Sequence, residues 1–177
     1  SNALGSGCRE TRDGGLTVFG RRAVERMNRL GMLIDVSHAG DETSLDTIRL
    51  SEAPGGISHA GAGELGPISK CKPDQVIRAC AERGGVIGIE AAPGTTMVKP
   101  DLVEASIETF MRHFEYCVDL VGIDGVTFGP DTFFGDHAGS YGIPSGALLA
   151  SGDSEYDAVV PEYVVGLENI GDFPNIV

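Results

Sequence analysis

Four short apolar segments alternate with four helix-like segments over residues 17–131. The apolar segments are residues 32–36, 55–58, 86–89 and 126–128, and the helix-like segments are residues 17–30, 41–50, 73–83 and 107–121. Apolar runs this short fit strands that are buried on both faces. Their alternation with helices predicts an α/β fold in which helices cover a parallel sheet. The open doubly wound sheet and the (β/α)8 barrel both satisfy this pattern.

Polar side chains follow the predicted strands at the point where each strand ends. His38 lies beyond the first strand, His59 beyond the second, Glu90 at the end of the third and Asp131 beyond the fourth. Barrel enzymes place their catalytic residues at the carboxyl ends of the strands, with one or two residues from each strand. The pattern therefore favours the barrel and predicts that these four side chains share one rim.

The chain is too short for a complete barrel. Eight strands typically occupy about 250 residues, whereas the predicted units here end near residue 131. Residues 132–177 are rich in Gly and Pro, with weak strand patterns at 158–160 and 163–165. Ser1-Asn2-Ala3 is typical of the remnant of an expression tag, so residues 4–177 are interpreted as a partial catalytic domain. Four parallel strands alone would leave two unpaired edges, which predicts association with another copy or with a missing piece.

Composition excludes some classes of function. The net charge is -13, which argues against nucleic-acid binding because that requires clustered Lys and Arg. No apolar run approaches the roughly 18 residues of a membrane helix, and no signal peptide opens the chain. The four cysteines form no Cys-x-x-Cys pair, and Cys80 and Cys117 lie in apolar helical patterns that predict core positions. Cysteines in this pattern favour location of the protein in the reducing cytoplasm.

Two Ser-His pairs are the strongest candidates for chemistry. Ser37-His38 and Ser58-His59 each close a predicted strand. Neutral imidazole is a good zinc ligand, and a catalytic zinc site needs about three protein ligands with one open position. Either histidine alone could simply form hydrogen bonds at a strand end, but two at equivalent positions favour metal binding. Asp131 could bind metal, act as a base, hold a substrate ammonium, or accept backbone hydrogen bonds at the start of a loop.

The remaining charged and titratable residues give weaker signals. Lys70 and Lys72 flank Cys71 in a loop and are interpreted as solvated charges. His113 lies beside Arg112 on the last predicted helix and is expected at the surface. His137 follows Asp131 closely enough in sequence to line the same site.

Several stretches resemble the membrane (renal) dipeptidase family. They are Gly15-Leu16-Thr17-x-Phe19-Gly20, Met27 to His38, Ser51-x-Ala53-Pro54, Ile57-Ser58-His59, Gly84 to Ile89, and Asp119 to Asp124 leading into Phe128-Gly129-Pro130-Asp131. The resemblance covers nearly all of residues 4–136. Its most specific part is the pair of Ser-His motifs 21 residues apart.

The resemblance implies the C-terminal half of a zinc-dependent (β/α)8 barrel of the amidohydrolase type, with dipeptides as substrates and a binuclear zinc site. It implies that His38 and His59 are zinc ligands on the fifth and sixth strands. Asp131, on the eighth strand, would be a catalytic residue beside the substrate's amino group. Lys70 stands where the family usually has an arginine that binds the substrate carboxylate. Lysine lacks the bidentate fork of arginine, so this position departs from the family.

A larger departure concerns the metal ligands. The family's first-strand His-x-Asp and its bridging glutamate belong to a part of the barrel that precedes the matched region, and no His-x-Asp occurs in this chain. We therefore expect the chain alone to hold zinc weakly, to hydrolyse no dipeptide at a useful rate, and either to form a homo-oligomer or to have a poorly ordered rim. The alternatives are a truncated non-catalytic module that oligomerises or binds a partner, and another amidohydrolase-type hydrolase completed by a second polypeptide.

Overall fold

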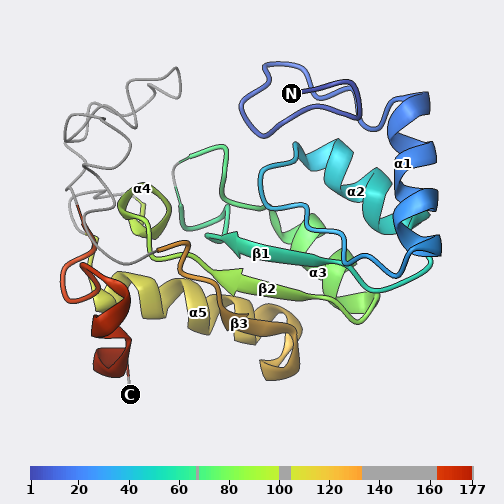
Figure 1. Ribbon diagram of the computed structural model, residues 1–177. Helices are drawn as coiled ribbons and strands as arrows, with labels where there is room; N and C mark the ends of the chain where they lie inside the picture. Colours follow the sequence, from blue (N-terminus) through green and yellow to red (C-terminus); the bar gives the residue numbers. More distant parts are fainter. Residues whose placement is uncertain (67, 100–104, 133–162, 177) are drawn as a thin grey trace.

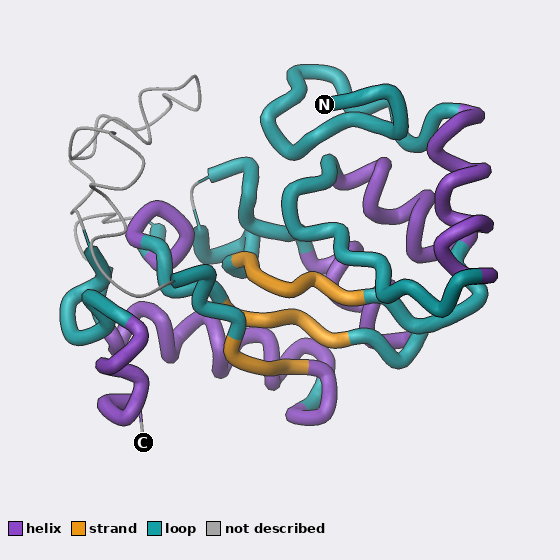
Figure 2. The backbone as a smooth tube through the Cα atoms, viewed as in Figure 1, coloured by secondary structure: helices purple, strands orange, loops and turns teal. Residues whose placement is uncertain are grey.

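A parallel three-stranded sheet forms the centre of the computed structural model, which describes residues 1–66, 68–99, 105–132 and 163–176 (Figure 1, Figure 2). Strands β1 (Gly56–Ala60), β2 (Val86–Ile89) and β3 (Val126–Phe128) lie in the order β1-β2-β3, and both pairings are parallel. Parallel neighbours need a crossover between them. Helix α3 (Asp74–Glu82) lies in the crossover from β1 to β2, and α5 (Ile107–Val121) in the one from β2 to β3. The predicted α/β class with a parallel sheet is confirmed.

Helices α1 (Val18–Arg29) and α2 (Asp41–Leu50) precede the sheet and begin in different ways. Thr17 is the N-cap of α1, with its Oγ1 accepting a hydrogen bond from the Gly20 N–H at 3.0 Å. The N-cap of α2 is Gly40, which has no side chain to accept such a bond. The carboxylate of Asp13, distant in sequence, accepts hydrogen bonds from the first N–H groups of α2 instead.

The first predicted strand, residues 32–36, does not form a strand. One isolated parallel bridge joins Asp35 to Gly56, with hydrogen bonds from Gly56 N–H to the Ile34 carbonyl (2.9 Å) and from Val36 N–H to the Gly56 carbonyl (3.0 Å). The next donor along β1, the Ser58 N–H, bonds to Asp35 Oδ1 at 3.0 Å. The segment runs beside β1 as expected, but a side chain replaces the backbone ladder there.

Short elements complete the described part of the chain. They are α4 (Pro93–Thr96), η1 (Ile123–Gly125) and η2 (Ile170–Ile176). The strand pattern at 163–165 corresponds to a single parallel bridge between Val165 and Ser106. The pattern at 158–160 and the candidate His137 lie outside the described residues.

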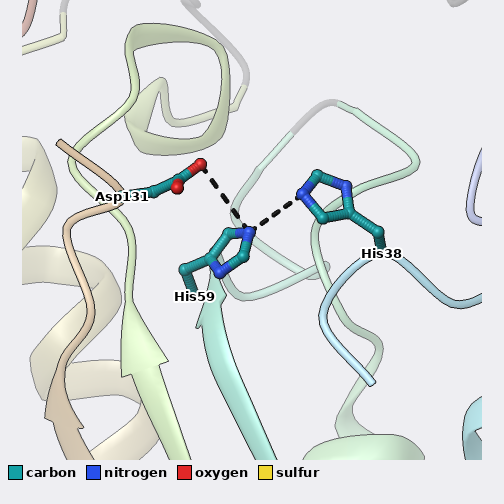
Figure 3. Close-up of side chains that lie close together, drawn as sticks. All are labelled: His38, His59 and Asp131. Carbon is teal, nitrogen blue, oxygen red and sulfur yellow. Dashed lines mark hydrogen bonds and ion pairs between the residues drawn. The ribbon is translucent and has the colours of Figure 1, made fainter. Parts of the chain in front are cut away.

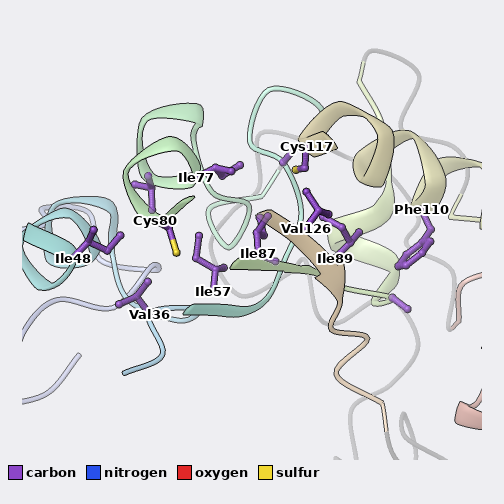
Figure 4. Close-up of a cluster of buried hydrophobic side chains, with 14 of the residues drawn as sticks. Val36, Ile48, Ile57, Ile77, Cys80, Ile87, Ile89, Phe110, Cys117 and Val126 are labelled. Carbon is purple, nitrogen blue, oxygen red and sulfur yellow. The ribbon is translucent and has the colours of Figure 1, made fainter. Parts of the chain in front are cut away.

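Apolar side chains from the strands and from helices α1, α2, α3 and α5 form the core (Figure 4). Each of the four main helices packs against the next in chain order: α1 on α2, α2 on α3, and α3 on α5. All four cysteines are free, and Cys71, Cys80 and Cys117 are buried, which confirms the core positions predicted for the last two. Among the described residues, no helix is both long and apolar enough to cross a membrane.

Two glycines permit a close approach of three backbones beneath the carboxyl ends of the strands. A Cβ atom on Gly88 would lie 2.1 Å from the Ser58 carbonyl oxygen, and one on Gly129 would lie 1.8 Å from the same atom. Neither distance is sterically possible. Strands β1 and β3 are not hydrogen-bonded neighbours, so their approach at Ser58 indicates that the sheet is strongly curved.

A glycine pattern after β1 has a structural explanation. Gly61-x-Gly63-x-x-Gly66 matches the G-x-G-x-x-G spacing of dinucleotide-binding turns, which also requires that a helix begin there. Here the next helix, α3, begins only at Asp74. A Cβ on Gly61 would lie 2.5 Å from the Thr95 carbonyl oxygen, and one on Gly66 would lie 2.3 Å from Cys71 Sγ. These glycines are therefore explained by close packing of the loop.

Candidate metal centre

Two imidazoles and one carboxylate converge at the carboxyl end of the sheet (Figure 3). His38 lies in the turn after residues 34–36, His59 lies on β1, and Asp131 follows β3. The Nε2 atoms of His38 and His59 are 2.9 Å apart, and Asp131 Oδ2 is 3.7 Å from His59 Nε2. The structure thus brings together three of the residues predicted from strand ends.

The protonation and backbone of this cluster suit a ligand. Burial lowers the pKa of His38, and the nearby charges of Lys70 and His59 lower it further, so its imidazole is neutral at pH 7. Asp131 has a φ of 53°, a left-handed conformation that non-glycine residues seldom adopt. Such local strain is found more often at functional sites than elsewhere.

The donor set fits zinc. Neutral imidazole nitrogen and carboxylate oxygen are typical zinc ligands, and two histidines with one carboxylate make up a known three-ligand catalytic set. The candidate ligand atoms of His38, His59 and Asp131 all lie within 4.8 Å of one another. The two Nε2 atoms are 2.9 Å apart, a distance that either an N–H···N hydrogen bond or a shared cation satisfies.

A hydrogen-bonded carboxylate supports both histidine motifs from below. Asp35 Oδ1 accepts hydrogen bonds from the Ser37 N–H (3.0 Å), the Ser37 hydroxyl (2.6 Å) and the Ser58 N–H (3.0 Å). Its Oδ2 accepts the Ser58 hydroxyl at 2.6 Å. Burial raises the pKa of Asp35, but the hydrogen bonds from Ser37 and Ser58 outweigh this effect and leave the pKa below its ordinary value. Ser58 Oγ is also 2.8 Å from His59 Nδ1.

Lys70 reaches the same rim but is held by a second carboxylate. Its Nζ lies 2.5 Å from Glu90 Oε1 and 3.5 Å from Asp131 Oδ2. The Glu90 side chain is fully buried, and within the described residues its Oε2 has no hydrogen-bond partner. Burial raises the pKa of Glu90, although the Lys70 ammonium opposes this shift. The prediction that Lys70 is a solvated charge is wrong, because it forms a largely buried ion pair on the candidate site.

The interpretation of Lys72 as a solvated charge is also wrong. It is completely buried, and its ammonium donates hydrogen bonds to the Ala39 carbonyl (2.5 Å) and to Ser44 Oγ (3.2 Å). Burial lowers its pKa. Lys72 therefore ties the turn after His38 to the start of α2.

His113 is buried rather than exposed. Its Nδ1 accepts a hydrogen bond from the Ala62 N–H at 2.9 Å, three residues after His59. Burial lowers its pKa to about 4, so it stays neutral at ordinary pH. The neighbouring Arg112 suggested a surface position, but the imidazole faces the loop that follows β1.

Sequence reasoning missed the hydrogen-bonding role of Asp35 and treated Glu90 as only a weak candidate. The signal for Asp35 was present in the sequence Asp35-Val36-Ser37-His38, because a carboxylate two residues before a serine can accept its N–H and its hydroxyl. The cross-chain partner Ser58 could not be read from sequence without knowing the register of the two segments.

Comparisons with known proteins show the family of this chain. The family model described as "Membrane dipeptidase (Peptidase family M19)" matches residues 1–145. The chain belongs to the membrane dipeptidase family. Among curated relatives, Dipeptidase tcpJ of Claviceps purpurea is 29% identical over 163 residues, which are 92% of this chain and 32% of that protein. Dipeptidase 3 of Mus musculus is 32% identical over 132 residues, which are 75% of this chain and 25% of that protein. This member of the family therefore spans about a third or less of those relatives' length.

Two solved structures have a similar fold. An amidohydrolase from Pseudomonas aeruginosa superposes with a TM-score of 0.78 at 29% identity, over 99% of this chain and 53% of that chain. A metallo peptidase from Rhodobacter sphaeroides, liganded with a phosphinate mimic of the dipeptide L-Ala-D-Ala, superposes with a TM-score of 0.67 at 26% identity, over 92% of this chain and 39% of that chain. Metallopeptidases among the structures similar to this dipeptidase-family chain imply a metal cofactor for the family.

Proposed function

We propose that this chain supplies part of the zinc site of a metal-dependent dipeptidase, with His38 and His59 as metal ligands. The observation that carries the proposal is the 2.9 Å separation of the two Nε2 atoms, with Asp131 Oδ2 3.7 Å from His59 Nε2. When bound, zinc polarises a peptide carbonyl and lowers the pKa of a water molecule at its open position. The lowered pKa of His38 keeps that imidazole in the neutral form that a ligand needs.

Asp131 is proposed as the catalytic carboxylate. It is exposed, with 45% of its side chain accessible, so a substrate can reach it. An ionised carboxylate there can hold the substrate ammonium and can take up or return a proton at Oδ2. Lys70 stands within 3.5 Å of that oxygen and limits how far Asp131 can turn away from His59.

Lys70 is proposed to bind the substrate's carboxylate, as the family's arginine does. The ion pair with Glu90 weakens binding of the substrate carboxylate, because Glu90, at 2.5 Å, already neutralises the Lys70 ammonium. In a complete protein, Lys70→Ala is expected to raise KM more than it lowers kcat, because a contact made equally in the ground state and the transition state is lost. An unchanged KM across several dipeptides would reject this role.

The architecture is proposed to be four βα units of a (β/α)8 barrel. Support comes from the parallel order β1-β2-β3, from helices that pack in chain order, and from the curvature that brings Gly129 to Ser58. A half-barrel would leave further metal ligands to another part of the polypeptide or to a second chain. On this view the chain alone holds zinc weakly and turns over no dipeptide at a useful rate.

Zinc titration of the isotope-labelled chain, followed by NMR of the imidazole rings, tests the metal site. The ring signals of His38 and His59 are expected to shift together, while those of buried His113 stay fixed and serve as an internal control. Zinc that moves neither ring at millimolar concentration would contradict the site. A parallel dipeptide assay tests the partial-site interpretation, which would be wrong if the chain held two zinc ions tightly and turned over rapidly.

A further inference from the structure

The two hydrogen bonds of the Ser58 hydroxyl define the protonation of His59. Ser58 Oγ lies 2.6 Å from Asp35 Oδ2 and 2.8 Å from His59 Nδ1. A hydroxyl has a single proton, whereas an ionised carboxylate can only accept. If Ser58 gave its proton to His59, two lone pairs would face each other at 2.6 Å. The proton therefore lies toward Asp35, and Ser58 Oγ accepts from His59.

We propose that Asp35 and Ser58 are positioning residues that hold His59 in its Nδ1–H tautomer, with the Nε2 lone pair directed at His38 and Asp131. The inference deepens the proposed metal site and rests on it for its functional meaning. In neutral imidazole only one nitrogen has a proton, so a proton on Nδ1 leaves Nε2 free to bind a cation. The main chain of His59 is held at the same time, since the Ser37 hydroxyl accepts its backbone N–H at 3.1 Å.

The contact between the two serine hydroxyls does not change this result. Ser37 Oγ is 3.0 Å from Ser58 Oγ and 2.6 Å from Asp35 Oδ1. Ser37 donates its single proton to Asp35 Oδ1, as Ser58 does to Asp35 Oδ2, so the contact between the two hydroxyls takes no proton from either bond. The tautomer of His59 is therefore determined by Asp35 through one intervening hydroxyl.

His38 lacks an equivalent arrangement within the described part of the chain. Its ring makes one hydrogen-bonding contact there, at Nε2 with His59. His113 provides the opposite case, because its Nδ1 accepts from a backbone N–H and its neutral ring must have the proton on Nε2. One spectrum of the protein should therefore contain His59 and His113 as opposite tautomers.

Imidazole 15N chemical shifts of the metal-free chain, measured above pH 7, test the proposal. In the unmodified protein, His59 is expected to show a protonated Nδ1 and an unprotonated Nε2, and His113 the reverse. Asp35→Asn can no longer accept at both side-chain atoms, and Ser58→Ala removes the intervening hydroxyl. In both variants the two 15N shifts of His59 are expected to move toward each other, as a mixture of tautomers forms.

Asp13→Asn is the matched control. Asp13 accepts hydrogen bonds from the N–H groups of Gly15, Glu42 and Thr43 and from the Thr43 hydroxyl, much as Asp35 does, but it contacts neither histidine. This variant should lose stability without altering the tautomer of His59. If Asp35→Asn does not fold, Ser58→Ala still decides the question, because it leaves the backbone bond to Asp35 in place.

A second measurement separates this inference from the proposed function. Loss of the partner of a zinc-bound histidine typically weakens metal affinity by about 10- to 100-fold, and we expect a loss in this range for zinc in Ser58→Ala but not in Asp13→Asn. An Nε2–H tautomer of His59 in the unmodified chain, or an unchanged tautomer in both variants, would overturn the inference. A tautomer that shifts as expected without any change in zinc binding would sustain the positioning role and overturn the metal site.

Discussion

The two Ser-His motifs are identical as dipeptides but differ in structure. In Ser58-His59 the serine hydroxyl contacts the ring of its own histidine at 2.8 Å. In Ser37-His38 the serine turns away from its histidine, bonding to Asp35 and accepting the backbone N–H of His59. Both serines therefore serve His59, and within the described residues His38 is held at one ring nitrogen.

The difference arises from the backbone that precedes each motif. His59 lies on β1, which pairs with β2 on either side of it, at Ile57 and at Ala60, with a register shift between those two residues. His38 follows a segment whose only ladder contact with β1 is a single bridge. In the proposed metal site, His59 would be the more rigid ligand and His38 the more mobile one. Such a combination is useful where the coordination of a metal changes during a reaction.

The largest expected effect is on the free energy of unfolding. It comes from His113, which is buried and belongs to neither Ser-His motif. Its pKa of about 4 in the folded protein lies below the ordinary 6.5, so the unfolded chain takes up the proton first as the pH falls. The free energy of unfolding should therefore fall by about 3 kcal/mol between about pH 6.5 and pH 4, at 1.36 kcal/mol for each pKa unit. Chemical denaturation across this range measures it.

His113→Asn is the informative variant for that prediction. The side-chain oxygen of asparagine can still accept from the Ala62 N–H but has no proton to gain in this range. The part of the acid destabilisation that is due to His113 should vanish, and a weaker dependence from His38, whose pKa is also lowered, should remain. An acid profile identical to that of the unmodified protein would show that burial of His113 does not control stability.

The next effect compares the two proposed metal ligands, His59 and His38, directly. His59→Ala removes the preorganised ligand, and we expect it to weaken zinc affinity by about 100-fold or more, beyond the typical effect of losing an outer hydrogen-bond partner. His38→Ala should cost less, because a less constrained ligand contributes less to a preformed site. Competition with a zinc chelator gives both affinities. Equal losses would mean that the two motifs hold their rings equally well.

Substitution of the two serines should affect the free energy of unfolding and the zinc affinity to different degrees. Ser37 is 1% exposed and accepts the His59 N–H, so Ser37→Ala is expected to lower the free energy of unfolding by about 1 to 2 kcal/mol. Ser58 is exposed, so Ser58→Ala should cost less than 1 kcal/mol, roughly the loss of a surface hydrogen bond. Zinc affinity should fall more in Ser58→Ala than in Ser37→Ala. Parallel effects of the two substitutions on both quantities would contradict the division of roles.

The smallest expected effect concerns Lys70, whose charge acts on His38. Burial is the main reason for the low pKa of His38, and the Lys70 ammonium is the next. Lys70→Met keeps the length of the side chain and removes the charge, so the pKa of His38 should rise toward its ordinary value. NMR titration of the His38 ring measures this. Lys99→Met, which removes an exposed ammonium that bonds to the Gly63 carbonyl, is the control and should leave the pKa of His38 unchanged.

The sequence predicted the helices and three strands because each one has a strong local pattern. It predicted the convergence of His38, His59 and Asp131 because strand ends of a parallel sheet meet at one edge. It failed where a residue's partner is distant in the chain. Asp13 caps α2 from outside, Asp35 replaces a ladder bond, and Lys72 is buried against Ala39. Local charge and periodicity contain no information about these contacts.

The backbone contact of Ser58 with Gly88 and Gly129 has a consequence for altering the site. A side chain at either position is sterically forbidden, because it would collide with the Ser58 carbonyl oxygen next to His59. Substitution at Gly88 or Gly129 therefore cannot fill or recharge this part of the site. New substrate preferences in this chain would have to arise at other positions, such as Lys70 and Glu90.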